Sequence, residues 1–225
     1  MIVAIHQPNY LPYLGFFDKI FNSDVFVILD DAQFSKGDFH NRNRIKNQNG
    51  AKWLTIPVKA EFKSIRDIKI NQEFKFSNNS WNDYHLLQIK ENYKNSKCFN
   101  SLYPKIEKIL KQDYQFLLDI NLKMIYLLTE YFNINVKIVL SSILKISTNS
   151  TQRLIDITKY LAGDTYLSGT GAKSYIDINL FKENGINLIF QEFEHPYYKQ
   201  QYENFVPNLS AIDYCFNEGG NLFAK

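Results

Sequence analysis

Hydrogen-bonding side chains cluster near the start of the chain, at His6, Gln7, Asn9 and Tyr10. Prolines within and just after this stretch fix φ and favour an extended backbone in the residue before each. We therefore expect these side chains to be held in a defined arrangement. Histidine is the usual general base near neutral pH. The stretch predicts a binding site that contains a base; the alternative is a tight loop in which His6 bonds a neighbouring backbone group.

Carboxylates and a second histidine could take part in the same chemistry. Asp30 and Asp31 end a near-continuous apolar run, and His195 is held by a following proline. Because adjacent strand residues point to opposite faces, only one of the two carboxylates is expected to face a given cleft. There it would orient a histidine, accept a substrate amine or bind a metal; the alternative is a solvated strand end. The predicted catalytic residues are His6, Asp30, Asp31 and His195.

Two segments have the chemistry of a diphosphate-binding site. One holds Arg42 and Arg44, whose planar guanidinium groups match phosphate oxygens. The other is the small, hydroxyl-rich loop over residues 168–173, whose backbone N–H groups could form an anion nest, although it lacks P-loop spacing. The alternative for each is an ordinary solvated loop. The predicted substrate-binding residues are Gln7, Asn9, Tyr10, Gln33, Asn41, Arg42, Arg44, Ser168, Gly169, Thr170, Gly171 and Lys173.

Other kinds of site are not indicated. Cys98 and Cys215 form no CxxC motif, and no HxH or HExxH spacing supports a metal site. A net charge of +3, evenly spread, is too small for a DNA-binding protein. No apolar run approaches the ~18 residues of a membrane span. Without a basic region and a long apolar core at the N-terminus, the sequence does not predict a signal peptide, and we expect a cytoplasmic protein.

The elements that must position these residues follow an α/β pattern. A short apolar strand ends at His6, residues 14–21 have helical spacing, and residues 24–30 read as a strand buried on both faces. This βαβ unit places His6 at the carboxyl end of a parallel strand, where open α/β sheets bind ligands. Strands over 136–140, 165–168 and 186–191 and helices over 150–161 and 207–217 continue the pattern. We predict a Rossmann-like, mostly parallel sheet with flanking helices.

The middle of the chain follows a different pattern. Residues 32–50 are polar without a clear period, so Asn41–Arg44 is predicted as part of a loop. Residues 52–58 alternate as a strand, and residues 65–70 could pair with them as an antiparallel extension. Helices are predicted over 81–94, 103–113 and 114–132. We expect a single α/β domain over residues 1–225, with residues 79–133 forming a helical cap inserted between its two halves.

Several stretches together resemble the WbqC-like family, and the resemblance covers nearly the whole chain. They are HQPNYLPYLG from His6, LDDAQF from Leu29, NRNRI from Asn41, WLTIP from Trp53, STQRL from Ser150, YLSG from Tyr166, HP at His195 and FVPNLS from Phe205. Proteins of this family are found with surface-polysaccharide and O-antigen genes. The resemblance implies transfer of glycine or another acyl group onto an amino sugar. It supplies no catalytic residues, so the roles assigned above rest on the residues themselves.

The resemblance and the residues together predict an acyl- or aminoacyltransferase that acts on the amino group of a nucleotide-linked amino sugar. No cofactor is predicted; the donor is left open among a thioester on a carrier protein, an aminoacyl-tRNA and an amino acid activated by ATP. The chain is also similar, more weakly, to nucleotidylyltransferases and pantothenate synthetase, but it lacks the histidines of their HxGH motif. The alternatives are an ATP-dependent ligase or nucleotidyltransferase-like enzyme and a non-catalytic sugar-nucleotide-binding protein.

Overall fold

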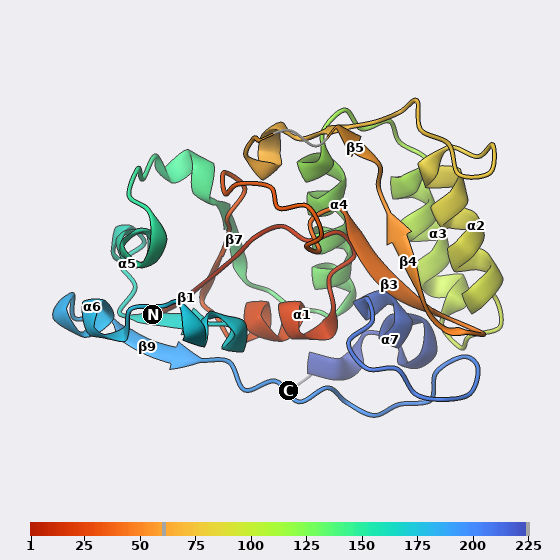
Figure 1. Ribbon diagram of the computed structural model, residues 1–225. Coiled ribbons are helices and arrows are strands. Elements are labelled where there is room, and N and C mark those ends of the chain that lie inside the picture. The colour runs from red at the N-terminus through yellow and green to blue at the C-terminus, as the bar shows by residue number, and fades with distance from the viewer. Residues whose placement is uncertain (60–61, 224–225) are drawn as a thin grey trace. The chain divides into compact units, whose positions relative to one another are not determined.

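The computed structural model describes residues 1–59 and 62–223 (Figure 1). Its contacts divide the chain into two compact units, each built from three segments. Unit 1 comprises Met1–Gln7, Gly15–Ala32 and Ile134–Glu194, and unit 2 comprises Pro8–Leu14, Gln33–Asn133 and His195–Lys225. The two units are described separately below.

Unit 1 contains a parallel sheet whose strands end at one common edge. Its order is β7-β2-β1-β8-β9, and every neighbouring pair is parallel. This confirms the predicted α/β fold. The strands are β1 (Ile2–His6), β2 (Val25–Ile28), β7 (Lys137–Leu140), β8 (Thr165–Ser168) and β9 (Asn187–Phe190).

Helices cover both faces of this sheet. Helix α1 (Leu14–Phe21) lies on the face that carries Phe26, because Phe16 meets the Phe26 ring at a centroid distance of 5.2 Å. The opposite face carries Val3 and Tyr166, which pack with α5 (Ser150–Tyr160) and α6 (Ile178–Glu183). Successive strand residues point to opposite faces, so each strand contributes to both cores. Because both faces of each strand are covered, the strands appear in the sequence as continuous apolar runs.

The strand order reverses between β1 and β8. From β1 the chain moves outward on one side to β2 and then β7, and it returns to the other side of β1 for β8 and β9. In open α/β sheets, ligands bind outside the carboxyl ends of the strands at such a switch point. His6 ends β1 and Ser168 ends β8, so both residues lie at this switch point.

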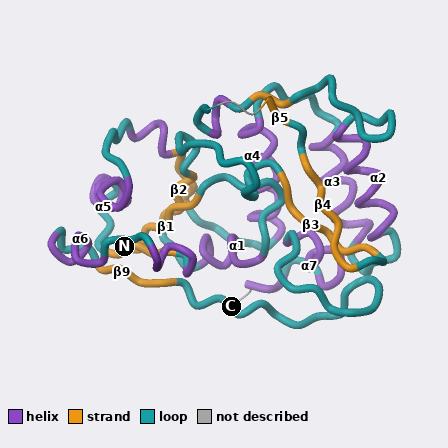
Figure 2. Tube along the Cα trace, in the orientation of Figure 1, coloured by secondary structure: helices purple, strands orange, loops and turns teal. Residues whose placement is uncertain are grey.

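Unit 2 combines helices with two short antiparallel pairs of strands. Figure 2 shows its helices in purple beside the strands of the hairpin in orange. The hairpin is formed by β3 and β4, and β5 pairs with β6. The elements are β3 (Arg42–Asn47), β4 (Gly50–Thr55), β5 (Val58–Lys59), β6 (Lys69–Ile70), α2 (Trp81–Tyr93), α3 (Phe99–Leu110), α4 (Leu117–Tyr131) and α7 (Ala211–Glu218).

Short 3-10 helices complete the described residues of both units. They are η1 (Ile65–Asp67) and η4 (Asn221–Phe223) in unit 2, and η2 (Ser141–Leu144) and η3 (Thr170–Ser174) in unit 1. The second of the predicted middle helices begins at Phe99 rather than Tyr103, and Pro104 lies inside it. The prediction for residues 65–70 is partly wrong: of the predicted strand 52–58 only Val58 pairs with this segment, together with the following Lys59, and β4 pairs with β3 instead.

The prediction of a loop at Asn41–Arg44 is also wrong, since β3 begins at Arg42. The alternation of apolar and polar residues that would identify β3 is not visible in the sequence, because a polar residue occupies a position that faces the core. Asn43 is buried, as is Ile45 two residues later on the same face of β3. The side-chain amide of Asn43 donates to Leu11 O at 2.7 Å. A buried amide that is hydrogen-bonded can replace an apolar residue at such a position. The two arginines therefore occupy the other face of a strand.

Candidate functional site

His6 lies at the end of β1 with its ring partly buried. The ring meets Phe16 edge-on at a centroid distance of 4.9 Å, and Nδ1 lies 2.9 Å from the carbonyl oxygen of Gln7. A carbonyl oxygen only accepts, so Nδ1 carries the proton and, in the neutral ring, the lone pair is on Nε2. This is the tautomer that a general base needs, with its orientation fixed by the backbone. Gln7 follows in the same unit.

Asp30 and Asp31 follow β2 in a turn, so the alternation expected of strand residues does not apply to them. Both carboxylates instead meet the Ser141 hydroxyl, at 3.0 Å from Asp30 and 2.5 Å from Asp31. The Ser142 amide also donates to Asp30 at 3.0 Å. Arg153 of α5 forms an ion pair with Asp31 at 2.5 Å. The expectation that the two carboxylates point apart is wrong, and together they join the ends of β2 and β7.

The predicted anion-binding loop follows β8 in unit 1. Ser168 is fully buried, and residues from Thr170 onward form η3. The Lys173 ammonium lies 5.1 Å from the centroid of the Phe190 ring, a cation–π contact within the unit. Gly169 and Gly171 have open space where a side chain would begin, because a Cβ at either would meet no atom within 4 Å. The backbone of this loop is thus accessible on the side of its glycines.

In unit 2, two predicted binding residues are buried. Asn9 is 7% exposed and Tyr10 is fully buried. The Tyr10 hydroxyl pairs with His85 Nδ1 at 2.8 Å, and burial lowers the pKa of His85 to about 3. This imidazole is therefore neutral at physiological pH, and the pair lies in the core of unit 2. Asn41 donates to Ile56 O at 2.8 Å, and Gln33 forms an isolated bridge with Ser64.

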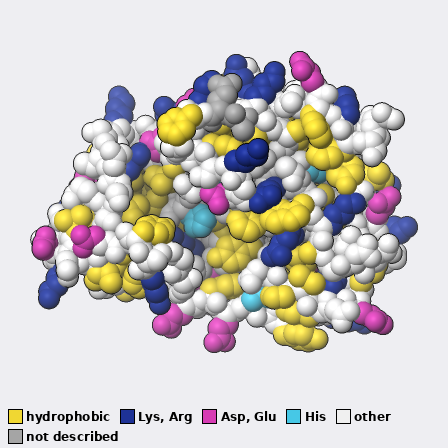
Figure 3. All heavy atoms as spheres, in the orientation of Figure 1, with side chains coloured by type: hydrophobic (Ala, Val, Ile, Leu, Met, Phe, Trp, Pro, Cys, Tyr) yellow, Lys and Arg dark blue, Asp and Glu magenta, His cyan; other side chains and the backbone are white. Residues whose placement is uncertain are grey.

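The outward face of the β3–β4 hairpin brings Arg42 and Arg44 to the Trp53 ring. The guanidinium carbons lie 4.4 Å (Arg42) and 5.7 Å (Arg44) from the ring centroid, and Trp53 is 42% exposed. Phe39 extends this surface, with its ring 5.9 Å from that of Trp53. We call these four residues the arginine–tryptophan face. In Figure 3, basic and hydrophobic side chains are interleaved over this part of unit 2.

The guanidinium groups of this face keep donors that the fold does not use. The terminal nitrogens of Arg42 and Arg44 donate to the carbonyl oxygens of Gly37 and Asn208 respectively. Both Nε atoms are withdrawn from solvent and have no hydrogen-bond partner among the described residues. A withdrawn donor without an acceptor costs free energy.

His195 lies in the segment 195–210 of unit 2. Its Nδ1 lies 2.9 Å from Pro196 O, which again leaves the lone pair of the neutral ring on Nε2. Partial burial lowers the pKa of His195 from its ordinary value, although the Pro196 contact opposes this. The ring packs with those of Tyr198 and Phe205. His195 is therefore a neutral imidazole near pH 7, as a general base requires.

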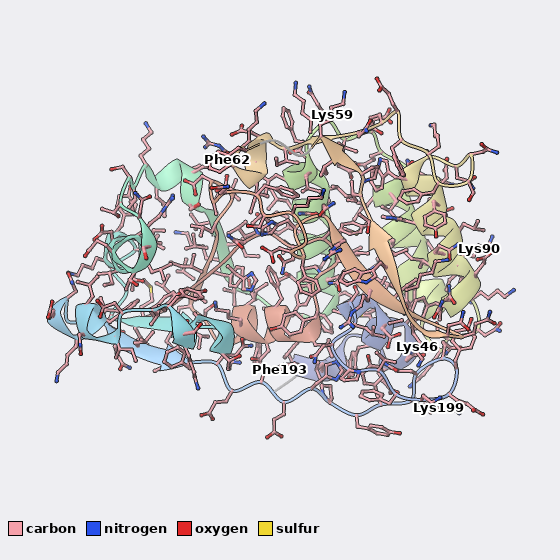
Figure 4. All side chains as sticks on the ribbon, viewed as in Figure 1. Lys46, Lys59, Phe62, Lys90, Phe193 and Lys199 are labelled. Carbon is pink, nitrogen blue, oxygen red and sulfur yellow. The ribbon has the colours of Figure 1, made fainter. Side chains whose placement is uncertain are left out.

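The segment around His195 is fixed by the β3 strand of the same unit. The Lys46 ammonium donates to Glu203 O at 3.0 Å and to Asn204 O. Figure 4 shows Lys46 beside this segment, which also carries Lys199. The Ser210 amide donates to Arg44 O at 2.8 Å. The strand that presents the arginine–tryptophan face therefore also positions the histidine-bearing segment.

Sequence reasoning did not assign Trp53, Ser141 or Arg153 to the candidate site. Reading Asn49-Gly50 as the turn would have paired Arg44 with Thr55; the turn lies at residues 48–49 and pairs Arg44 with Trp53. No local signal could have found Ser141, because it meets the carboxylates from the start of η2, more than a hundred residues away along the chain. In the described part of the chain, no group of three or more His, Cys, Asp or Glu residues could hold a metal ion. Nor does any helix there have the length and apolar character to cross a membrane.

A family model and one curated relative each match nearly the whole chain. The model of the WbqC-like protein family matches residues 7–224. The chain is 31% identical over 219 residues to the uncharacterized protein Rv1507c of Mycobacterium tuberculosis, an alignment that covers 96% of this chain and 94% of that protein. No solved structure matches the chain.

Proposed function

Because the chain belongs to the WbqC-like protein family, we propose that it transfers an acyl or aminoacyl group onto the amino group of a nucleotide-linked amino sugar in surface-polysaccharide (O-antigen) biosynthesis. The observation that carries this proposal is the arginine–tryptophan face. Its two guanidinium groups suit the diphosphate of a sugar nucleotide, and the exposed indole offers a stacking surface for the base.

The reaction needs a base because a sugar amine is mostly protonated at pH 7. His6 or His195 accepts that proton on Nε2, and the freed nitrogen lone pair attacks the donor carbonyl. A bond forms between nitrogen and the acyl carbon. The bond to the leaving group breaks with its electron pair, releasing a thiolate, a tRNA hydroxyl or AMP according to the donor. The proton lost from nitrogen in forming the amide leaves with that group or passes to solvent.

The proposal is tested first by binding. The protein is titrated with UDP- and dTDP-linked amino sugars, and ligand binding is read from its thermal stabilisation. Arg42→Ala and Arg44→Ala should each weaken binding about tenfold or more, since a hydrogen bond to a charged group is worth about 1.5–3 kcal/mol. The matched control is Arg66→Ala, which removes an exposed arginine of the same unit. Equal affinity in all three variants would remove the arginine–tryptophan face from the proposal.

A second candidate, an ATP-dependent ligase or nucleotidyltransferase-like enzyme, is favoured by the unit 1 sheet. Its strand order reverses between β1 and β8, the kind of position at which doubly wound sheets bind nucleotides. Such an enzyme would release AMP or pyrophosphate in step with product. If acyl transfer from a thioester or aminoacyl-tRNA proceeds without ATP, this candidate is eliminated.

A further inference from the structure

The hydrogen-bond ladder between β1 and β8 stops before the strands themselves do. Its last registered pair is Ala4 with Leu167, although β1 continues to His6. Met1 O accepts from the β8 side, whereas Ile2 O and His6 O accept from the β2 side. Carbonyl groups alternate along a strand, so Ile5 O points toward β8. The next rung would join it to the Gly169 amide, and among the described residues that bond is not formed.

The Ile5 carbonyl, which receives no hydrogen bond from β8 among the described residues, accepts one from a lysine side chain. Lys19 Nζ, from α1, donates to Ile5 O at 2.8 Å, and Lys19 is only 3% exposed. An ammonium group has three donors. In the described part of the chain, Ile5 O is the acceptor bonded to Nζ, and no carboxylate forms an ion pair with it. A buried ammonium with unused donors is costly to the fold, which is unusual unless something else completes its bonding.

The donor in the missing rung would be the amide of Gly169, a residue with open space beside it. Gly169 has φ −71° and ψ 152°, a conformation that any residue adopts, so the backbone there does not require glycine. A Cβ at this position would meet no atom within 4 Å, so packing does not require glycine either. The side of Gly169 where a side chain would stand is therefore open. Lys19 Nζ and the Gly169 amide thus belong to the same opened rung.

We propose that Lys19 Nζ and the Gly169 amide form an anion-binding subsite at the β1–β8 switch point, which takes a phosphate or carboxylate group of a small-molecule substrate. The anion accepts from donors that the fold leaves unused, and it lies at the strand ends where doubly wound sheets bind ligands. The residues of this subsite belong to unit 1, whereas the arginine–tryptophan face belongs to unit 2.

Anion binding at this subsite should change the protonation of the Lys19 amine. Burial lowers the pKa of Lys19 to about 7, and an anion beside the amine favours its charged form. Binding at pH 8 should therefore take up a proton. The neighbouring titratable groups are Asp18 on α1, which accepts from Gln191, and His6 on β1; Tyr166 of β8 lies on the opposite face of the sheet.

The test is calorimetric titration of the full chain at pH 8, in two buffers of different ionisation enthalpy. Pyrophosphate probes a phosphate site, and acetate and glycine probe a carboxylate site. Lys19→Met removes the ammonium, and Gly169→Pro removes the amide donor at a φ that proline adopts. Lys182→Met, at an exposed position of α6, is the matched control.

The wild type should bind either pyrophosphate or the carboxylates with proton uptake, and the Lys182→Met protein should behave in the same way. Lys19→Met should abolish the uptake, and Lys19→Met and Gly169→Pro should each weaken binding tenfold or more. If the Lys19→Met protein does not fold, the affinity of the Gly169→Pro protein alone tests the proposal. Failure of the wild type to bind any probe, or unchanged affinity in the variants, would overturn the proposal. No turnover is involved, so the outcome is independent of the proposed transfer reaction.

Discussion

At the scale of single residues, several hydrogen-bond donors converge on the Asp213 carboxylate in unit 2. This carboxylate is fully buried and accepts from Tyr93 at 2.6 Å, Tyr198 at 2.8 Å and Gln200 at 2.9 Å. Burial raises the pKa of Asp213, although its hydrogen bonds oppose this. Three donors from α2 and the segment 195–210 converge on one group. The network therefore holds that segment by hydrogen bonding rather than by apolar burial alone.

We predict that Tyr198→Phe lowers the free energy of unfolding by about 1–3 kcal/mol, because the carboxylate loses a buried donor. The neighbouring Tyr197 is 84% exposed, so Tyr197→Phe should change stability by less than about 0.5 kcal/mol. Urea unfolding of both variants measures the difference. Equal stability of the two variants would show that the Asp213 network does not stabilise unit 2.

A second prediction at this scale concerns pH. Burial lowers the pKa of Lys19 to about 7, from an ordinary value of 10.5. Between these values the unfolded chain binds more protons than the native chain, so the free energy of unfolding should rise with pH. The contribution of Lys19 to this slope is at most about 1.4 kcal/mol per pH unit. Lys19→Met should flatten the rise between pH 7 and 10; the same slope in both proteins would contradict the assigned burial of the amine.

At the scale of elements, the parallel strands could be predicted from the sequence and the β3 strand could not. β1 and β2 are apolar because helices cover both faces of their sheet, so their composition alone identifies them. In β3, the buried Asn43 takes an inward position by bonding Leu11 O, and this breaks the apolar alternation. The arginines were recognised, but the strand that orders them was not. Hydrogen bonds to distant backbone carry no local signal.

The convergence of Asp30, Asp31 and Ser141 gives a prediction about the β2–β7 edge. Ser141→Ala should destabilise the protein by about 1–3 kcal/mol, because Asp30 and Asp31 lose the one hydroxyl donor that they share. Ser142→Ala is the control: only the backbone amide of Ser142 bonds Asp30, and the substitution keeps that amide. Thermal unfolding compares the two variants. If Ser142→Ala costs as much as Ser141→Ala, the hydroxyl has no special role at this edge.

At the scale of the whole molecule, each unit carries part of the predicted chemistry. Unit 1 holds His6, the two aspartates and the loop after β8, and unit 2 holds the arginine–tryptophan face and His195. The chain passes between the units repeatedly, so stretches that are adjacent in sequence, such as Gln7 and Asn9, belong to different units. Sequence reasoning could select candidate side chains from their types. It could not assign them to units, because that depends on the packing of segments far apart in the chain.

The most direct test of the proposed function is the mass of the sugar nucleotide after incubation with the protein and each donor class. Tandem mass spectrometry should find one added acyl or aminoacyl group on the sugar nitrogen with at least one donor. His6→Ala or His195→Ala should abolish that product, according to which imidazole accepts the proton. An unmodified sugar nucleotide with every donor, or full transfer by both variants, would contradict the account.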